Sequence, residues 1–428
     1  MKTACHCFLI IVFLLIVIAA PNYAQTINAR FTTAAYAWEQ QEIDSSKADH
    51  FRFYQLAQLS IGRLGLPNLS FHSYIQFSND FSDQAVDDPR WWIYNCYFDL
   101  KNIANAIDVS LGRQRIYAGV GYGTVDGLQL QYRVKDYFKI KFYIGTLAPL
   151  AKSTEVRDFN SDNLTYGFHL SSTKLKKVRL GLSYARQSVE PMQYRSPGLY
   201  TGTFRLEHPI TVWQKELIGL DVSSQVSSKF QLNGRLDFNL QAENVKRGEL
   251  GGRYQFNRNF EIGLDYIYRT PYIDQNSIFS VFEINPNQEL ALQGRYRWND
   301  YQFYLTAANV ILEDDNNFRL GLGCSWKSLY LGYNRRAGYG GDSDGLTFNF
   351  SYPLLPKLNV TLGSNFASYR FSEFSTEKDQ AVAGVLGLDY SPTKNLTLQA
   401  EGQVLNNKIF SHDVRFFFRG TYALFQRL

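Results

Sequence analysis

FQLNGRLDFNLQ, residues 230–241, is the stretch that decides the fold. Its large apolar side chains share one parity: Phe230, Leu232, Leu236, Phe238 and Leu240. The positions between them carry amides and charges: Gln231, Asn233, Arg235, Asp237, Asn239 and Gln241. Because successive side chains of a β-strand point to opposite faces, this period of two predicts a strand with one apolar face and one hydrated face.

Similar segments recur along the chain, and about 22 of them can be delimited by their alternation and by turn residues. They begin near Phe31 and end with 414–425. Short connections of turn-like composition alternate with long polar ones at 147–163, 190–211 and 270–287. We expect the short turns and both termini on the periplasmic side and the long loops outside the cell.

The predicted fold is all-β: a transmembrane antiparallel up-and-down β-barrel of about 16–22 strands, with residues 25–428 as one domain. The number is a range because a barrel of fewer strands with longer loops would absorb the weaker segments. Backbone groups in a bilayer must be paired within the protein, and a closed barrel does this without edges. The alternative is a secreted soluble β-sandwich or propeller, but its strands would rarely be so polar on one face.

Residues 1–24 have the features of a secretory signal peptide: Lys2, an apolar run at 8–20 and a small-residue cleavage point at 21–24. The run of 13 residues is shorter than the roughly 20 that a spanning helix needs. We therefore expect cleavage and export, with an uncleaved anchor as the alternative. The expected location is the bacterial outer membrane, with outer-membrane lipid and the barrel-assembly machinery as partners.

The composition agrees with a membrane barrel. Aromatic residues make up 16% of the chain, with 29 Tyr and 32 Phe, and a barrel places such rings in its lipid-facing band and interfacial girdles. The net charge of +5 is small and scattered, so no nucleic-acid partner is expected. Beyond the signal only Cys96 and Cys324 remain, which predicts two thiols, with one long-range disulfide as the alternative.

Strand parity also assigns charged residues to the lumen. The inward cations are Arg52, Arg133, Lys139, Lys141, Arg179, Arg235, Arg253, Arg295, Arg297 and Arg319. The inward anions are Asp108, Asp221, Asp237, Glu249, Glu261, Asp265, Glu289, Asp389 and Glu401. This near balance predicts weak overall ion preference, with local clusters such as Arg295 and Arg297 setting any selectivity. The alternative for each residue is a cross-strand ion pair that only stabilises the wall.

The stretch LGRQRIYAGVGYGTVDG, residues 111–127, departs from this pattern. The lipid-facing parity of Ile107, Val109 and Leu111 would include Arg113 and Arg115, unless a bulge near Gly112 switches them inward or the strand leaves the membrane. We expect this glycine-rich segment to fold into the lumen and narrow it. The alternative is a bulged turn at the rim.

The Gly-Arg-Gln of 112–114, followed by glycines and the Asp-Gly of 126–127, resembles a pattern of porin-like outer-membrane proteins, including those with alginate-export-like barrels. The resemblance covers this motif and the general barrel pattern. It implies that Arg113 and Arg115 contact anionic or sugar-like solutes near a constriction. The predicted pore-lining residues are therefore Arg113, Arg115, Arg133, Lys139, Lys141, Arg235, Asp237, Arg253, Asp265, Arg295, Arg297 and Arg319.

Other motifs carry little chemistry. The glycines at 119, 121 and 123 precede no helix-forming segment, so they are not a dinucleotide fingerprint. The histidines beyond the signal lack the spacing of zinc ligands, and the proximity of His169 and Ser171 in sequence does not define a hydrolase. We expect no enzymatic activity, no metal and no cofactor.

The last segment carries Phe416, Phe418, Tyr422 and Leu424 on one face. It resembles the aromatic-rich terminal strand that barrel-assembly machinery recognises, through Tyr422 and Phe425, although the sequence continues to Leu428.

The predicted function is an outer-membrane porin or channel for passive diffusion of small hydrophilic solutes. The alternative is a non-conducting barrel that acts as a partner in adhesion, assembly or a secretion complex. A transporter with an internal plug would need an N-terminal domain of more than a hundred residues, whereas strand-like alternation begins near Phe31. Active transport through a plugged barrel is therefore disfavoured.

Overall fold

The structure, a computed structural model, describes residues 25–427 apart from 42–46, 83–87, 136, 150–153, 173–174, 176, 191–212, 272–284, 314, 339–340, 371–376 and 409–412. The predicted signal peptide lies outside the described residues. Among the residues described, none belongs to a helix long and apolar enough to cross a membrane.

The described chain forms 22 strands. Their bounds are β1 Thr26–Gln41, β2 Lys47–Gly62, β3 Leu69–Asp80, β4 Arg90–Ile103, β5 Ile107–Ala118, β6 Gly121–Val134, β7 Phe138–Leu147, β8 Leu164–Ser172, β9 Val178–Val189, β10 Trp213–Gln225, β11 Phe230–Asn239, β12 Asn244–Gln255, β13 Phe260–Arg269, β14 Asn287–Trp298, β15 Tyr301–Ile311, β16 Asn316–Trp326, β17 Leu329–Gly338, β18 Asp342–Leu355, β19 Leu358–Arg370, β20 Asp379–Tyr390, β21 Leu396–Asn406 and β22 Asp413–Arg427.

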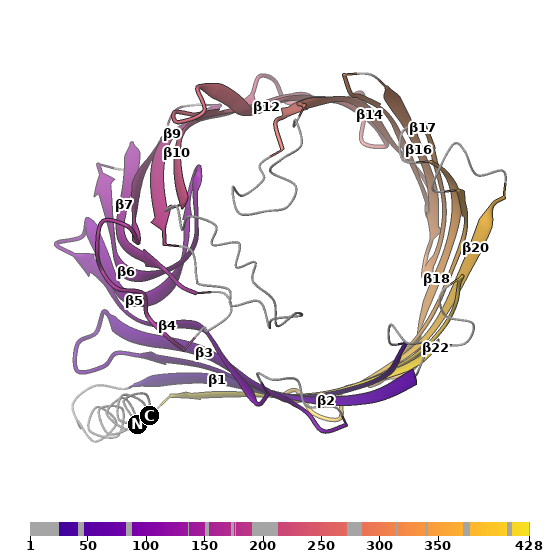
Figure 1. The fold of residues 1–428 in the computed structure, drawn as a ribbon, viewed down its shortest axis with the longest axis horizontal. Coiled ribbons are helices and arrows are strands. Elements are labelled where there is room, and N and C mark those ends of the chain that lie inside the picture. Colours follow the sequence, from indigo (N-terminus) through magenta and orange to yellow (C-terminus); the bar gives the residue numbers. More distant parts are fainter. Residues whose placement is uncertain are drawn as a thin grey trace, which may run out of the picture.

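Each strand pairs antiparallel with its neighbours in sequence, and β1 pairs with β22 from Thr26↔Arg427 to Ala37↔Phe416. The sheet is thus one closed cylinder (Figure 1). This confirms the predicted up-and-down barrel at the upper end of its range of strand numbers. It excludes the sandwich alternative, which needs two stacked sheets.

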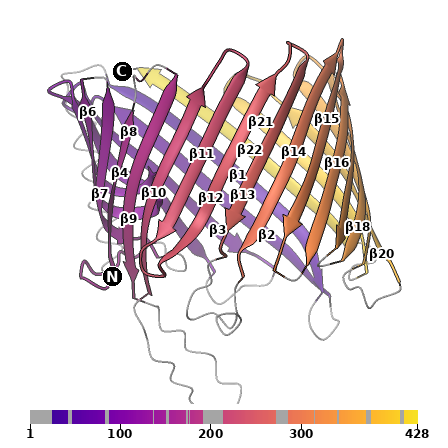
Figure 2. The same cartoon turned by 90° about the horizontal axis from the view of Figure 1, so that it is seen from above.

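The two ends of the barrel differ in their connections. At one end, here called the turn end, the connections run from two residues at 299–300 to six at 63–68, and the Thr26↔Arg427 pair lies there too. Asn299 and Lys327 adopt the positive φ that tight hairpin turns require. The other end, the loop end, carries the long connections at 148–163, 190–212 and 270–286. Figure 2 shows the tilted strands between the two ends, with the C-terminus at the turn end.

The two faces of the wall differ as the alternation predicts. Leu220 of β10 lies opposite Leu236 of β11, and these outward side chains are 53% and 47% exposed. The next cross-strand pair, Asp221↔Arg235, has the opposite parity and faces inward. The apolar residues therefore do not form a core between layers but cover the outside of the cylinder.

Aromatic rings gather on the outer face of the wall near the turn end. Tyr254 contacts Phe256 at 4.7 Å between ring centroids, and Phe256 stacks on Phe260 at 5.2 Å. Tyr301 stacks on Trp326 at 6.1 Å. Such a belt is typical of the level at which a barrel meets a membrane interface.

Cys96 lies on β4 and Cys324 on β16, and no disulfide joins them.

Candidate functional site

The hairpin of β5 and β6 is the feature that most changes the lumen. Its connection at the loop end is only Gly119 and Val120. The neighbouring strands pair with only part of this hairpin. Strand β4 pairs with β5 as far as Cys96↔Arg113, and β7 pairs with β6 as far as Val125↔Leu147. Residues 116–123 pair only with each other in the ladder. We call residues 113–126 the lumen hairpin.

The tip of the lumen hairpin is hydrogen-bonded to the inner face of the neighbouring part of the wall, at β7 and β9. The backbone N–H of Val120 donates to Ser183 Oγ at 3.1 Å. Gln187 Nε2 donates to the Tyr122 carbonyl at 3.0 Å, and Lys141 Nζ donates to the Tyr117 carbonyl at 3.1 Å. Ser183 and Gln187 lie on the inward parity of β9 and Lys141 on that of β7, so the hairpin is folded inside the barrel.

Apolar contacts hold the hairpin where the bonds place it. Ile116, Ala118 and Val125 pack on Tyr143 of β7 as a buried cluster. Val120 packs on Ala185 and Leu217, inward residues of β9 and β10. Burying these side chains inside an otherwise hydrated lumen removes apolar surface from water, which stabilises the folded-in position.

Two glycines allow the hairpin to bend inward. A Cβ on Gly127 would lie 2.1 Å from the carbonyl oxygen of Ile144, and one on Gly112 would lie 2.4 Å from that of Cys96. Gly112 also has a φ of +125°, which side chains rarely adopt. The hairpin leaves the wall at these two positions, where the backbone of the adjacent strand leaves no room for a side chain.

This bend explains how Arg113 and Arg115 can face the lumen although they share the parity of lipid-facing residues. The β5–β6 register is continuous from Ile107↔Tyr132 to Ala118↔Gly121, so it contains no bulge. Arg113 and Arg115 keep the parity of the lipid-facing residues of β5. Because the hairpin leaves the wall, the face that carries these two arginines turns toward the lumen. The predicted infolding is therefore present, and the rim-turn alternative is wrong.

Arg113 joins the two strands of the hairpin through its ion pair with Asp126. Its side chain is 5% exposed, and its Nε and Nη2 donate to the two carboxylate oxygens of Asp126 at 2.7 Å each. Nη2 also donates to the Glu155 carbonyl at 2.6 Å, which ties the β7–β8 connection to the hairpin. Little of the guanidinium remains for a solute.

Arg115 is presented differently. It is exposed, and its guanidinium lies 5.1 Å from the centre of the Tyr117 ring. Tyr117 and Tyr122 are 59% and 57% exposed on the same face of the hairpin. Of the two arginines that the resemblance singled out, Arg115 is the one available to solutes.

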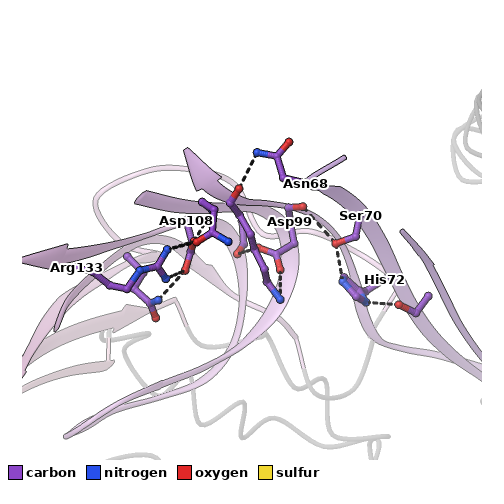
Figure 3. Close-up of polar contacts among 11 residues, drawn as sticks. Asn68, Ser70, His72, Asp99, Asp108 and Arg133 are labelled. Carbon is purple, nitrogen blue, oxygen red and sulfur yellow. Dashed lines mark hydrogen bonds and ion pairs between the residues drawn. The ribbon is translucent and has the colours of Figure 1, made fainter. Parts of the chain in front are cut away.

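Arg133 belongs to a polar network at the turn end of β2–β6. Its Nη1 donates to Asp108 at 2.6 Å and its Nη2 to Asn102 Oδ1 at 2.6 Å. Figure 3 shows this ion pair beside a second group, in which the His72 ring contacts Ser70 at 3.0 Å. Arg133 therefore links β6 to β5 and β4 at the turn end, away from the lumen hairpin.

The other predicted pore-lining residues divide into paired and unpaired ones. Arg235 donates to both oxygens of Asp237 at 3.0 Å, and Arg319 pairs with Glu289. Arg295 lies 4.0 Å from Glu261 and is 50% exposed. Lys139 lies half-buried on β7, and Arg297 is exposed at the turn end of β14. The wall-stabilising alternative thus applies to several of them, and contact with solutes stays a prediction for all.

An inner-wall pocket of about 880 Å³ lies next to the tip of the hairpin, across β8–β13. His169 lines it and also lies under the tip, 3.3 Å from where a Cβ on Gly119 would be. Its charged lining residues are Arg179, Asp221, Arg235, Glu249, Arg253 and Asp265. The pocket brings together Arg235, Arg253 and Asp265 of the predicted residues. No three His, Cys, Asp or Glu residues among those described gather as a metal site.

Three buried residues beneath the hairpin tip are absent from the predicted site. Ser183 is fully buried, and Gln187 and Lys215 are 6% and 5% exposed. Lys215 Nζ lies 4.7 Å from the centre of the Tyr122 ring. Alternation assigns all three to the inward face, but only knowledge of the folded hairpin shows that they hold it.

Comparison with known proteins supports the fold. No protein-family model matches the sequence, and no curated protein is significantly similar to it. A variant of the ferric enterobactin receptor PfeA of Pseudomonas aeruginosa is 9% identical, with a TM-score of 0.58 over 92% of this chain and 80% of that one. The fold is an outer-membrane barrel fold.

Two further structures align less closely. The outer membrane protein OpdK of P. aeruginosa is 10% identical over 94% of this chain and 99% of its own, with a TM-score of 0.45. The translocation pore of the P pilus usher PapC is 8% identical over 93% and 99%, with a TM-score of 0.49. The porin-like sequence motif at 112–127 finds no match in these comparisons.

Proposed function

We propose that this protein is a channel of the bacterial outer membrane, through which small hydrophilic solutes diffuse passively. The observation that carries the proposal is the closed wall with an apolar outside and a polar, charged inside. The apolar exterior needs a hydrocarbon surrounding, because soluble monomers rarely expose apolar patches beyond a few hundred Å². The hydrated interior then gives solutes a path across the bilayer.

The two sides of the lumen differ in a way that suits selective passage. The inward residues of β18–β20 are small and neutral at mid-wall, for example Thr347, Asn365 and Ala383. The charged pocket and the lumen hairpin lie on β5–β13, across the lumen in Figure 1. A solute would therefore pass between a neutral wall and a charged one, where the field is directed across its path.

A second candidate function is favoured by the size of the barrel. Strands spaced about 4.8 Å apart and tilted about 40° give a 22-strand cylinder roughly 40 Å across between opposite backbones. That width exceeds what small solutes require, and known barrels of this size can hold a plug in the lumen. The second candidate is thus a non-conducting barrel whose lumen is occupied by a partner.

Conductance separates the two candidates. The purified protein, reconstituted in a planar bilayer under a salt gradient, is expected to give discrete steps of current with a reversal potential near zero, because the inward charges nearly cancel. A preparation that inserts, as judged by protease protection in liposomes, but gives no steps would contradict the diffusion channel and favour the occupied barrel.

Arg295 and Arg297 supply a sharper test of where ions pass. Both lie on the inward parity of β14 and are exposed. Their joint replacement by glutamate changes the local charge by four and is expected to move the reversal potential toward cation selectivity. An unchanged reversal potential would place both residues off the ion path. Lys327→Glu, in the β16–β17 turn, is the control.

A further inference from the structure

The inner-wall pocket is lined by charges of both signs, and several of them form no close ion pair with another described residue. Two of the lining charges pair with neighbours that do not line the pocket: Arg235 lies 3.0 Å from Asp237, and Glu249 lies 2.6 Å from Arg247. Among the described residues, by contrast, Arg179 and Arg253 form no ion pair.

The carboxylates beside these two arginines are also little engaged. Asp221 is 37% exposed, and its one ion-pair partner in the described part of the chain is Arg235, at 3.9 Å. Asp265 accepts a hydrogen bond from Gln293 Nε2 at 2.9 Å through one of its oxygens. With respect to the described part of the chain, the four side chains Arg179, Asp221, Arg253 and Asp265 thus retain capacity for a ligand.

Register places these residues as two diagonal pairs of opposite sign. Arg253 lies two positions from Gly251, the cross-strand partner of Asp265. Arg179 lies two positions from Gly181, the partner of Asp221. Diagonal neighbours on one face are about 7 Å apart at Cα. Each pair therefore presents a cation and an anion with a gap between them.

Glycines on the facing strands shape the gap in the first pair. A Cβ on Gly251 would lie 2.4 Å from Asp265 Oδ1, so the carboxylate occupies the space that a side chain there would fill. A Cβ on Gly263 would lie 3.5 Å from Arg253 Cγ, so the arginine stem lies over the opposite strand in the same way. Asp265 thus lies over Gly251 on the strand of Arg253, and Arg253 lies over Gly263 on the strand of Asp265. The two glycines together make the space between the charged groups.

We propose that this pocket binds zwitterionic solutes of the α-amino-acid class, with the carboxylate at Arg253 and the ammonium at Asp265. The proposal rests on the channel function proposed above and names the solute class it would serve. Arg179 and Asp221 form a second subsite with the same diagonal register on β9 and β10.

Charge balance is what favours zwitterions over charged solutes. The six charged lining residues comprise three cations and three anions. An anion attracted by Arg253 is repelled by Asp265 at a similar distance, and the reverse holds for a cation, whereas a zwitterion gains from both. A volume of about 880 Å³ is ample for an amino acid and its water.

Three ligands with one carbon skeleton test this directly: L-alanine, its anionic analogue N-acetyl-L-alanine and its cationic analogue L-alaninamide. Binding to the purified barrel in detergent is measured by saturation-transfer NMR. L-alanine is expected to bind about tenfold more tightly than either analogue, the effect of one charge-assisted contact.

Single neutralisations should invert this order in opposite directions. Asp265→Asn is expected to prefer N-acetyl-L-alanine, and Arg253→Gln to prefer L-alaninamide. A purely structural role would weaken all three ligands together. Arg258→Gln and Asp300→Asn, which lie in turns outside the pocket, are matched controls that should keep the wild-type order.

The outcomes separate the two proposals. Equal binding of the three ligands, or variants that do not invert the order, would overturn the zwitterion site. If salt conductance is present in such a preparation, the channel function stands without it. If the wild type shows the expected order in detergent but gives no current steps in a bilayer, the pocket is supported and passive diffusion is overturned.

Discussion

Replacing Gly127 with valine should release the lumen hairpin and raise the single-channel conductance. A Cβ at this position would lie 2.1 Å from the Ile144 carbonyl and 2.6 Å from Gly145 Cα, both backbone atoms that cannot turn aside. The hairpin could then no longer bend inward beside β7. The part of the lumen that the hairpin occupies would then be open to solvent, and conductance in a planar bilayer should rise by roughly half or more. Trypsin should also cut the released hairpin at Arg115.

Gly384→Val is the matched control, because a Cβ there meets no atom within 4 Å. A second variant guards against misfolding of the first. Replacing residues 116–123 with Asn-Gly removes the tip and leaves the strand pairs that β4 and β7 make with the hairpin. If this shortened barrel conducts as the wild type does, the hairpin does not narrow the permeation path.

Arg113→Met should produce the largest loss of stability. The change leaves the carboxylate of Asp126, 11% exposed, without its bidentate partner and releases the Glu155 carbonyl. Breaking a buried ion pair by removing one member costs about 3–5 kcal/mol. On heating in detergent, the folded barrel migrates in gel electrophoresis as a compact species until it unfolds. The temperature of this change in mobility should be lower for the variant.

Two companions identify the cause of that loss. Arg113→Met combined with Asp126→Leu removes both charges and should recover most of the stability. Arg295→Met breaks a 4.0 Å contact of a half-exposed arginine and should cost no more than about 1 kcal/mol. A double variant as unstable as the single one would show that the carboxylate left behind is not the source of the loss.

The regular wall was predictable because its signal is local. Residues 230–241 predict β11, and the structure ends that strand at Asn239 with Leu240 in the connection. Strand β10 runs over Trp213–Gln225, although apolar alternation is clear in the sequence only over 218–222, because polar residues at its ends hide the pattern. The strand at 26–41 was recognised only by its onset near Phe31, because small alanines dilute its apolar face.

The site was less predictable because its contacts are not local. Glycines and broken parity at 111–127 indicated that this segment enters the lumen, but not which wall it meets. Ser183 lies 63 positions from Val120, whose N–H it accepts. The role of Arg113 depends on Glu155, in a connection without periodicity. The pocket depends on gaps left by Gly251 and Gly263, which sequence alone presents only as weak points in two strands.

The seam between β1 and β22 constrains how the molecule can be made. Thr26 pairs with Arg427, so the edge of β1 that faces β22 stays unpaired until β22 is in place. Until then two unpaired edges and an apolar exterior are exposed together, a state prone to aggregation. Closure of the ring requires β1 and β22 to meet, and their pairing removes both exposed edges in one step.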